Sequence, residues 1–333
     1  MSKWIIRFPL NVLSWAIGLV GIAALTLTAM IAAPLERLPE LTSISQTVRA
    51  VDRSAMPPLS RFSARDGTEL AFRHYPARGP STGQIAILVH GSAGSSVAVH
   101  ALADALAARG VETYAPDIRG HGGSGSRGDV GFIGQLEDDM ADFVAVVRKT
   151  SPNEPLTLLG HSSGGGFALR VAGSQIQDLF ARTVLLAPYL GYDAPSTRAD
   201  SGGWAKADIP RFLALVALQR LGIDCCGSLP TLAFAVPANS ERNVNRAYSY
   251  RLMRNFATRS YQHDLAGARH PITLISGAAD ELMLPGNYAD AVHAVAPSVE
   301  VRLIDGVDHM GIVCNAQGVA AVADYVASTR TGS

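Results

Sequence analysis

The pattern of apolar and polar positions separates a long apolar segment from a region in which strand-like and helix-like patterns alternate. No charged residue occurs between positions 10 and 33. Roughly two dozen residues at about 1.5 Å each form a helix of about 36 Å, enough to cross a hydrocarbon core of about 30 Å. The pattern therefore predicts a membrane-spanning helix near the start of the chain.

Two other interpretations of this segment stay open. A cleaved signal peptide also begins with positive residues, but its apolar core is usually about 7 to 15 residues long. A buried core helix is usually apolar on one stripe, whereas this segment is apolar all round. We expect an uncleaved single-pass anchor within residues 1–34. Lys3 and Arg7 favour a cytoplasmic N-terminus, which predicts an extracytoplasmic position for the following domain.

The rest of the chain has the pattern of an α/β fold. Short apolar runs typical of buried strands alternate with segments of helical periodicity. A hairpin around Asp66-Gly67 begins this region, because Asp-Gly favours tight turns. The alternation predicts a mostly parallel sheet with helices on both faces. We expect strands at 61–65, 69–75, 85–89, 111–115, 156–159, 183–187, 272–276 and 299–303, and helices at 97–109, 136–149, 164–172 and 319–328.

The same pattern divides the chain into regions. The interval before position 271 is mostly helical in pattern, with the clearest helices expected at 209–221 and 244–259. A helical insertion there would lie beside the strand ends where α/β proteins bind ligands, so we interpret it as a cap. The expected regions are an N-terminal membrane anchor (1–34), a connector (35–60) with one short helix near 44–51, an α/β core (61–188 and 271–333) and the cap (189–270).

Composition limits the classes of function. The chain has 28 Lys+Arg and 28 Asp+Glu, so its formal net charge is zero and no nucleic-acid partner is indicated. Three cysteines, Cys225, Cys226 and Cys314, define no disulfide framework. We expect them to be small buried thiols, although a bond from Cys314 to one of the other two is possible in an oxidising compartment.

The strongest chemical signal is the segment Gly160-His161-Ser162-Ser163-Gly164. It places Gly-x-Ser-x-Gly between an apolar strand and a helix, as a nucleophile elbow requires. Such a turn strains the backbone of the serine, and the residues two positions away must lack a Cβ. Of the two serines in this segment, only Ser162 has glycine at both positions, so we expect it to be the nucleophile.

A catalytic serine needs a base that a third group orients. In this type of fold the chain order is Ser, then acid, then His. Asp280 follows the strand expected at 272–276, and His309 follows the strand expected at 299–303. We expect these two residues to be the acid and the base. The rival candidates are Glu281, Asp305 and Asp308 for the acid, and His293 and His270 for the base.

An oxyanion hole needs two donors. The N–H of Ser163 is expected to be one, and that of Ser92, in the glycine-rich loop after the strand at 85–89, the second.

A second glycine-rich loop contains a literal G-x-G-x-x-G at Gly120, Gly122 and Gly125. No helix begins on these glycines and no acidic partner is evident on a following strand, so we expect a structural loop rather than a nucleotide site.

These motifs resemble the α/β-hydrolase superfamily, and within it the monoacylglycerol lipase and lysophospholipase branch, which includes serine aminopeptidase-type hydrolases. The resemblance covers roughly residues 61–330. It rests on Asp117-x-Arg119-Gly-His121-Gly-x-Ser124, together with His90-Gly91 and Gly160-His161-Ser162. It implies a triad of Ser162, Asp280 and His309 with Ser92 and Ser163 at the oxyanion hole. The anchor and the cap depart from the family pattern.

Together these inferences predict a membrane-anchored serine hydrolase. We expect it to cleave carboxylic esters, especially lipid-like acyl esters, by two-step acyl transfer without a metal or organic cofactor. Its partners would be a small-molecule acyl ester and, through the N-terminal helix, membrane lipid. An acyltransferase or a serine aminopeptidase could use the same triad, and a non-catalytic binding module is the alternative from another class. Acyl length, head group and oligomeric state are not predicted.

Overall fold

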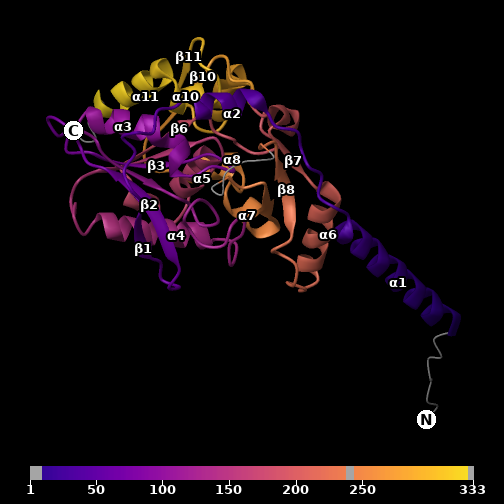
Figure 1. Ribbon diagram of the computed structural model, residues 1–333. Helices are drawn as coiled ribbons and strands as arrows, with labels where there is room; N and C mark the ends of the chain where they lie inside the picture. The colour runs from indigo at the N-terminus through magenta and orange to yellow at the C-terminus, as the bar shows by residue number, and fades with distance from the viewer. Residues whose placement is uncertain (1–9, 238–243, 329–333) are drawn as a thin grey trace.

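The computed structural model describes residues 10–237 and 244–328 (Figure 1). A sheet of eight strands lies at its centre, in the order β1-β2-β4-β3-β5-β6-β10-β11. The first two strands form the expected antiparallel hairpin, and β2 is also antiparallel to β4. All pairs from β4 to β11 are parallel. The strands are β1 (Ser60–Ser63), β2 (Glu69–Tyr75), β3 (Ile85–Val89), β4 (Glu112–Pro116), β5 (Leu156–His161), β6 (Arg182–Leu186), β10 (Ile272–Gly277) and β11 (Glu300–Ile304).

Helices cover both faces of this sheet. Right-handed crossovers place α3 and α4 on opposite faces, because the chain moves in opposite directions along the sheet before and after β4. The helix α11 packs against α3, and α5 is joined to α4 by an ion pair between Arg170 and Glu137. These helices are α3 (His100–Ala108), α4 (Gln135–Val147), α5 (Ser163–Ala172), α9 (Tyr288–His293), α10 (Gly311–Cys314) and α11 (Ala316–Ser328), with 3₁₀ turns at Ser96–Val99, Gln177–Leu179, Ala199–Gly203 and Pro285–Asn287.

The central strands are buried along their whole length. Every residue of β3, β5, β6 and β10 is buried. Because both faces of a parallel sheet are covered, such strands are mostly apolar along their length rather than alternating in polarity. This explains why their positions follow so directly from the sequence, and it makes the sheet a rigid base for the loops at its carboxyl edge.

The segment between β6 and β10, which we interpreted as a cap and continue to call the cap, contains a small sheet that the sequence pattern does not predict. Strands β7 (Ala205–Ala207), β8 (Pro230–Phe234) and β9 (Ala247–Ser249) form an antiparallel sheet. The prediction of one helix at 244–259 is therefore wrong. Tyr248 pairs with Leu232 in the sheet, and the Ser249 side chain caps the helix that begins after it. The cap helices are α6 (Ile209–Arg220), α7 (Tyr250–Asn255) and α8 (Tyr261–Gly267).

The N-terminal helix α1 (Leu10–Ala32) extends away from the rest of the molecule (Figure 1). Its segment Val12–Ala32 is long and apolar enough to cross a membrane, although a signal sequence would satisfy the same criterion. No part of its apolar window is buried, which contradicts the interpretation as a core helix. The following helix α2 (Thr42–Arg49) places Ile44 in the main hydrophobic core, so part of the connector belongs to the folded domain.

The cysteines differ from the expectation in their burial. Cys225 is exposed, while Cys226 and Cys314 are half-buried, and all three are free thiols. The expectation of three buried thiols is therefore wrong. Cys225 follows α6 in an exposed turn, where no core is available to cover it.

Candidate active site

The Ser162 turn has the strained geometry that its motif predicts. Ser162 lies between β5 and α5 with φ 56° and ψ −119°, a conformation that non-glycine residues rarely adopt. A Cβ on Gly160 would lie 2.1 Å from the carbonyl oxygen of Gly164. A Cβ on Gly164 would lie 2.3 Å from the carbonyl oxygen of His90. Both glycines are required because backbone atoms occupy the space of a side chain.

Asp280 and His309 are brought together from two loops at the same edge of the sheet. Asp280 follows β10 and His309 follows β11, and these strands are parallel neighbours. The His309 Nδ1 lies 2.8 Å from the Asp280 Oδ2, and both side chains are buried. The other oxygen of Asp280 accepts hydrogen bonds from the backbone amides of Leu282 and Met283, each at 2.9 Å. The carboxylate is thereby fixed against the imidazole.

Electrostatics keep Asp280 ionised. Burial alone would raise its pKa, because it disfavours the charged form. The His309 ring and the amides of Met283 and Leu282 outweigh this effect, and the pKa of Asp280 lies below its ordinary value. A carboxylate in this state can hold the Nδ1 proton and direct Nε2 away from itself.

The rival candidates have other contacts. Glu281 accepts a hydrogen bond from the backbone amide of His309 at 3.0 Å, and Asp308 accepts one from Gly311 at 2.6 Å. Both therefore brace the loop that carries His309. The other rivals lie on the surface: Asp305 is exposed, His270 pairs with Asp178, and His293 contacts the carbonyl oxygen of Val299.

A buried histidine next to Ser162 supports the His309 loop. His161 Nε2 contacts the backbone carbonyl of His309 at 3.0 Å, and the two rings lie 4.8 Å apart. Burial, together with the nearby His309, lowers the pKa of His161 to about 3. His161 is therefore neutral and can donate its Nε2 proton to that carbonyl. The sequence motif contained this residue, but nothing in the motif indicated this contact.

The loop after β3 lies against the elbow. A Cβ on Gly91 would lie 3.2 Å from the Ser162 Cβ, so the loop passes directly over this residue. Ser92 follows Gly91, and Ser163 is the first residue of α5. Their positions on two sides of Ser162 fit the geometry of two converging backbone donors.

The cap holds this loop through contacts that sequence reasoning missed. The Trp204 Nε1 donates a hydrogen bond to the Ser92 Oγ at 2.9 Å. The Tyr248 hydroxyl accepts a hydrogen bond from the Ala93 backbone amide at 2.7 Å. The backbone amide of Asn245 donates one to the Ala93 carbonyl at 2.8 Å. Ala93 has φ 62°, so its strained backbone is fixed from the cap. No motif surrounds these cap residues, and only the fold brings them to the loop.

The glycine-rich loop after β4 is filled by its own side chains. The Asp117 carboxylate accepts hydrogen bonds from the amides of Ser96 and Gly123, at 2.7 and 2.8 Å. A Cβ on Gly122 would lie 2.2 Å from this carboxylate. The turn therefore surrounds Asp117, as expected for a structural loop.

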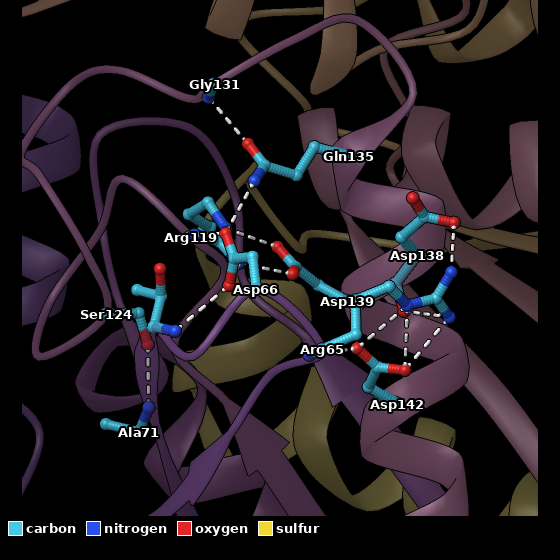
Figure 2. A network of polar contacts seen from close by, with 11 residues as sticks. Arg65, Asp66, Ala71, Arg119, Ser124, Gly131, Gln135, Asp138, Asp139 and Asp142 are labelled. Atoms are coloured by element: carbon cyan, nitrogen blue, oxygen red, sulfur yellow. Dashed lines mark hydrogen bonds and ion pairs between the residues drawn. The ribbon is translucent and has the colours of Figure 1, made fainter.

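A charge network centred on the buried Arg119 also holds this loop (Figure 2). The Arg119 guanidinium pairs with Asp139 of α4 at 2.7 Å and with Asp66 of the hairpin turn at 2.9 Å. Gln135 donates to Asp66 at 3.0 Å. Ser124 accepts a hydrogen bond from the Ala71 amide at 2.8 Å, which ties the loop to β2 (Figure 2). The loop is thus fixed to three elements of the core.

Comparison with known proteins identifies the family. A model of the family described as serine aminopeptidase, S33, matches residues 80–313, which is more than half of the chain. The chain belongs to this family. The matched region contains the elbow, both loops after β10 and β11, and the cap.

This S33 hydrolase is also similar to individual proteins. An uncharacterized protein of Mycobacterium tuberculosis is 25% identical over 292 residues, with 81% of each chain covered. A monoglyceride lipase of Mus musculus is 30% identical over 152 residues, which cover 45% of this chain and 48% of the relative. A structure of a soluble variant of monoglyceride lipase from Saccharomyces cerevisiae has a TM-score of 0.60 at 18% identity, with 82% of this chain and 94% of that chain covered. The protein is a hydrolytic enzyme with the α/β-hydrolase fold, and its relatives include lipases.

Proposed function

We propose that this S33 hydrolase is a membrane-anchored serine esterase whose triad is Ser162, His309 and Asp280. The observation that carries the proposal is the buried contact of 2.8 Å between His309 Nδ1 and Asp280, on loops at the sheet edge that carries the strained Ser162 turn. A nucleophile, a base and an orienting acid in this chain order are the parts that acyl transfer needs.

The first half of the reaction forms an acyl-enzyme. Ser162 Oγ attacks the ester carbonyl carbon while His309 Nε2 takes its proton. Asp280 stabilises the resulting imidazolium through Nδ1. The backbone N–H groups of Ser92 and Ser163 bind the oxyanion, and one such donor is typically worth about 2.7–4 kcal/mol. His309 then protonates the alcohol, which leaves.

The second half releases the acid. Water enters the site of the departed alcohol, and His309 takes a proton from it as it attacks the acyl carbon. Collapse of the second tetrahedral intermediate breaks the bond to Ser162 Oγ, which recovers its proton from His309. The chemistry uses side chains and backbone amides of this chain throughout.

A lipid-like acyl ester is the proposed substrate class. Relatives named as monoglyceride lipases and the apolar helix α1 both support it. A membrane-held enzyme meets acyl esters where they are concentrated. Cleavage of aminoacyl bonds is the second candidate, because the family is described as serine aminopeptidase.

The proposal also assigns α1 as an uncleaved anchor. Lys3 and Arg7 precede it, which favours the N-terminus in the cytoplasm and the catalytic domain outside. The contacts between α1 and the cap, described below, support retention of this helix in the mature protein.

The test uses the full-length protein in detergent. It is treated with a fluorophosphonate probe and assayed on p-nitrophenyl esters of increasing acyl length and on aminoacyl p-nitroanilides. Ser162→Ala should abolish labelling and ester turnover, whereas Ser163→Ala, which keeps its backbone N–H, should retain both. Loss of labelling in the Ser163 variant alone would refute the nucleophile assignment, and turnover of the anilides alone would replace the esterase by an aminopeptidase.

A further inference from the structure

One buried cation joins the apolar helix to the cap. Arg211 of α6 is buried, with 5% of its surface exposed. Its Nε donates to the Ile31 carbonyl at 3.0 Å, and its guanidinium also donates to the Ala33 carbonyl. These carbonyls lie at the end of α1, where a helix leaves its last carbonyl groups without internal partners. A positive charge there is also favoured by the helix dipole.

The chain that leaves α1 stays attached to the cap. Glu36 forms an ion pair with Lys206 of β7 at 2.8 Å. The Leu41 amide then donates a hydrogen bond to the Ala235 carbonyl, just after β8, at 2.9 Å. Together with the contacts of Arg211, these two contacts hold the segment that follows α1 against the cap.

The burial of side chains along α1 agrees with this contact. Side chains 12–26 are exposed, whereas Leu27, Met30 and Ile31 are half-buried. This spacing of three and four residues lies on one helix face. Since α1 packs against α6 (Figure 1), this face of its last turns is covered by the cap.

The cap helix itself exposes apolar side chains. Ile209, Leu213, Leu221 and Ile223 are 56%, 53%, 69% and 47% exposed. Ile209 and Leu213 are four residues apart and share a face of α6. Among the described residues, half of the exposed large apolar side chains outside α1 lie within positions 209–223. Exposed apolar side chains gathered in this way mark an interaction surface.

We infer that α6 and the turn after it dock into the lipid bilayer beside the anchor, with Arg211 fixing the two helices to each other. The inference rests on the proposed role of α1 as an anchor. If α1 crosses the bilayer, its last turns lie at the outer interface, and α6, about 18 Å long, packs against those turns. The exposed side chains of α6 then meet acyl chains rather than water. No charged side chain occurs between Arg211 and Arg220, which suits this position.

Fluorescence of the full-length protein in vesicles tests this docking. Cys225, Cys226 and Cys314 are first replaced by Ser, and single cysteines are placed at Leu213 or Leu221 and labelled with an environment-sensitive dye. The matched control is Leu303, an exposed leucine on β11, 43% exposed and remote from α1 (Figure 1). The vesicles contain phosphatidylcholine and phosphatidylglycerol, with or without lipids that carry a doxyl quencher on the acyl chain.

We expect the dye at 213 and at 221 to shift to the blue and to lose fluorescence to the doxyl lipids, while the dye at 303 does neither. Equal behaviour at all three positions in protein that floats with the vesicles overturns the docking but leaves the anchor intact. Protein that does not float overturns both. A blue shift without quenching by lipid, dependent on protein concentration, would show that a second copy covers α6 and would also overturn the docking.

The variant Arg211→Gln tests the role of Arg211 separately from that of the exposed apolar side chains of α6. The variant leaves the carbonyls of Ile31 and Ala33 without the cation. We expect it to float normally and to turn over a soluble p-nitrophenyl ester normally, but to lose most of the quenching at 213. Unchanged quenching in a variant that retains esterase activity would overturn the role of Arg211.

Discussion

The ionisation of Asp280 depends on two opposing effects of its surroundings. Burial disfavours the carboxylate, while His309 and two backbone amides favour it, and the balance places its pKa below 3.8. The ionised form therefore contributes stability above pH 3.8, and this contribution is lost as the pH falls through the lowered pKa. At neutral pH the carboxylate is charged and able to orient the imidazole.

Replacing the charge of Asp280 tests its proposed role. Asp280→Asn keeps the shape but offers an amide to His309 Nδ1, which favours the wrong tautomer. We expect kcat to fall by about 10⁴-fold. Steady-state kinetics on a p-nitrophenyl ester measures the loss, and Asp305→Asn, at an exposed rival position, should change kcat little. A small loss in the Asp280 variant would remove it from the triad.

Buried neutral histidines predict a pH dependence of stability. Burial lowers the pKa of His90, His121 and His161, and that of His161 falls to about 3 from 6.5. Below pH 6.5 these histidines bind protons in the unfolded chain but stay neutral in the folded chain, so stability is lost as the pH falls. For His161 alone the slope is about 1.4 kcal/mol per pH unit.

Thermal unfolding between pH 7 and pH 4 measures this dependence. We expect the melting temperature of the wild type to fall with pH, and His161→Gln to show a shallower slope. His263→Gln, at an exposed position of α8, is the matched control and should keep the wild-type slope. Parallel slopes for the wild type and the His161 variant would show that His161 is not the neutral group inferred here.

At the scale of elements, the cap and the loop after β3 act as one unit. The indole N–H of Trp204 holds the Ser92 hydroxyl, and the next residue is fixed by Tyr248. We expect Trp204→Phe to lower kcat about fivefold with little change in KM, since one neutral hydrogen bond contributes about 1 kcal/mol. In a double-mutant cycle, adding Trp204→Phe to Ser92→Ala should lower kcat no further than Ser92→Ala does alone. Additive losses would show that Trp204 does not act through Ser92.

The strands whose positions follow most directly from the sequence share one physical property. Buried parallel strands such as β3 and β10 are mostly apolar along their whole length, so their positions can be predicted without knowledge of the neighbouring strands. Asp280 follows the buried strand β10, and His309 follows β11, the less buried edge strand beside it. The strand β9 has only three residues, and its pairing with β8 stabilises it against the helical pattern of the segment. Contacts such as Trp204 to Ser92 depend on how the cap folds back, which local sequence does not encode.

At the scale of the molecule, the connector contributes to the core that supports the active site. Ile44 of α2 is buried, and α2 packs against α10, which directly follows the His309 loop. A chain that begins at Met30 keeps α2 and the carbonyls that Arg211 binds. A chain that begins at Met56 loses both, and burial of one isoleucine alone stabilises a fold by about 1.5–3 kcal/mol.

Truncation tests this contribution. We expect the chain from Met30 to retain the melting temperature and the esterase activity of the full-length protein in detergent. The chain from Met56 should melt at least about 3 °C lower, since about 1 kcal/mol shifts the melting temperature of a domain larger than 150 residues by about 2–4 °C. Equal melting temperatures would show that α2 is a passive linker. Ile44→Ala in the longer chain provides the matched control for the loss of burial alone.

The attachment of α1 to the cap has a consequence for how substrate arrives. If α1 anchors the chain as proposed, the enzyme would collect acyl esters by their lateral diffusion within one leaflet rather than from bulk water. Its rate should then follow the mole fraction of ester in the membrane rather than the total ester concentration. Adding inert phospholipid would slow such an enzyme at constant total substrate, because each enzyme samples only the two-dimensional solution in which it is anchored.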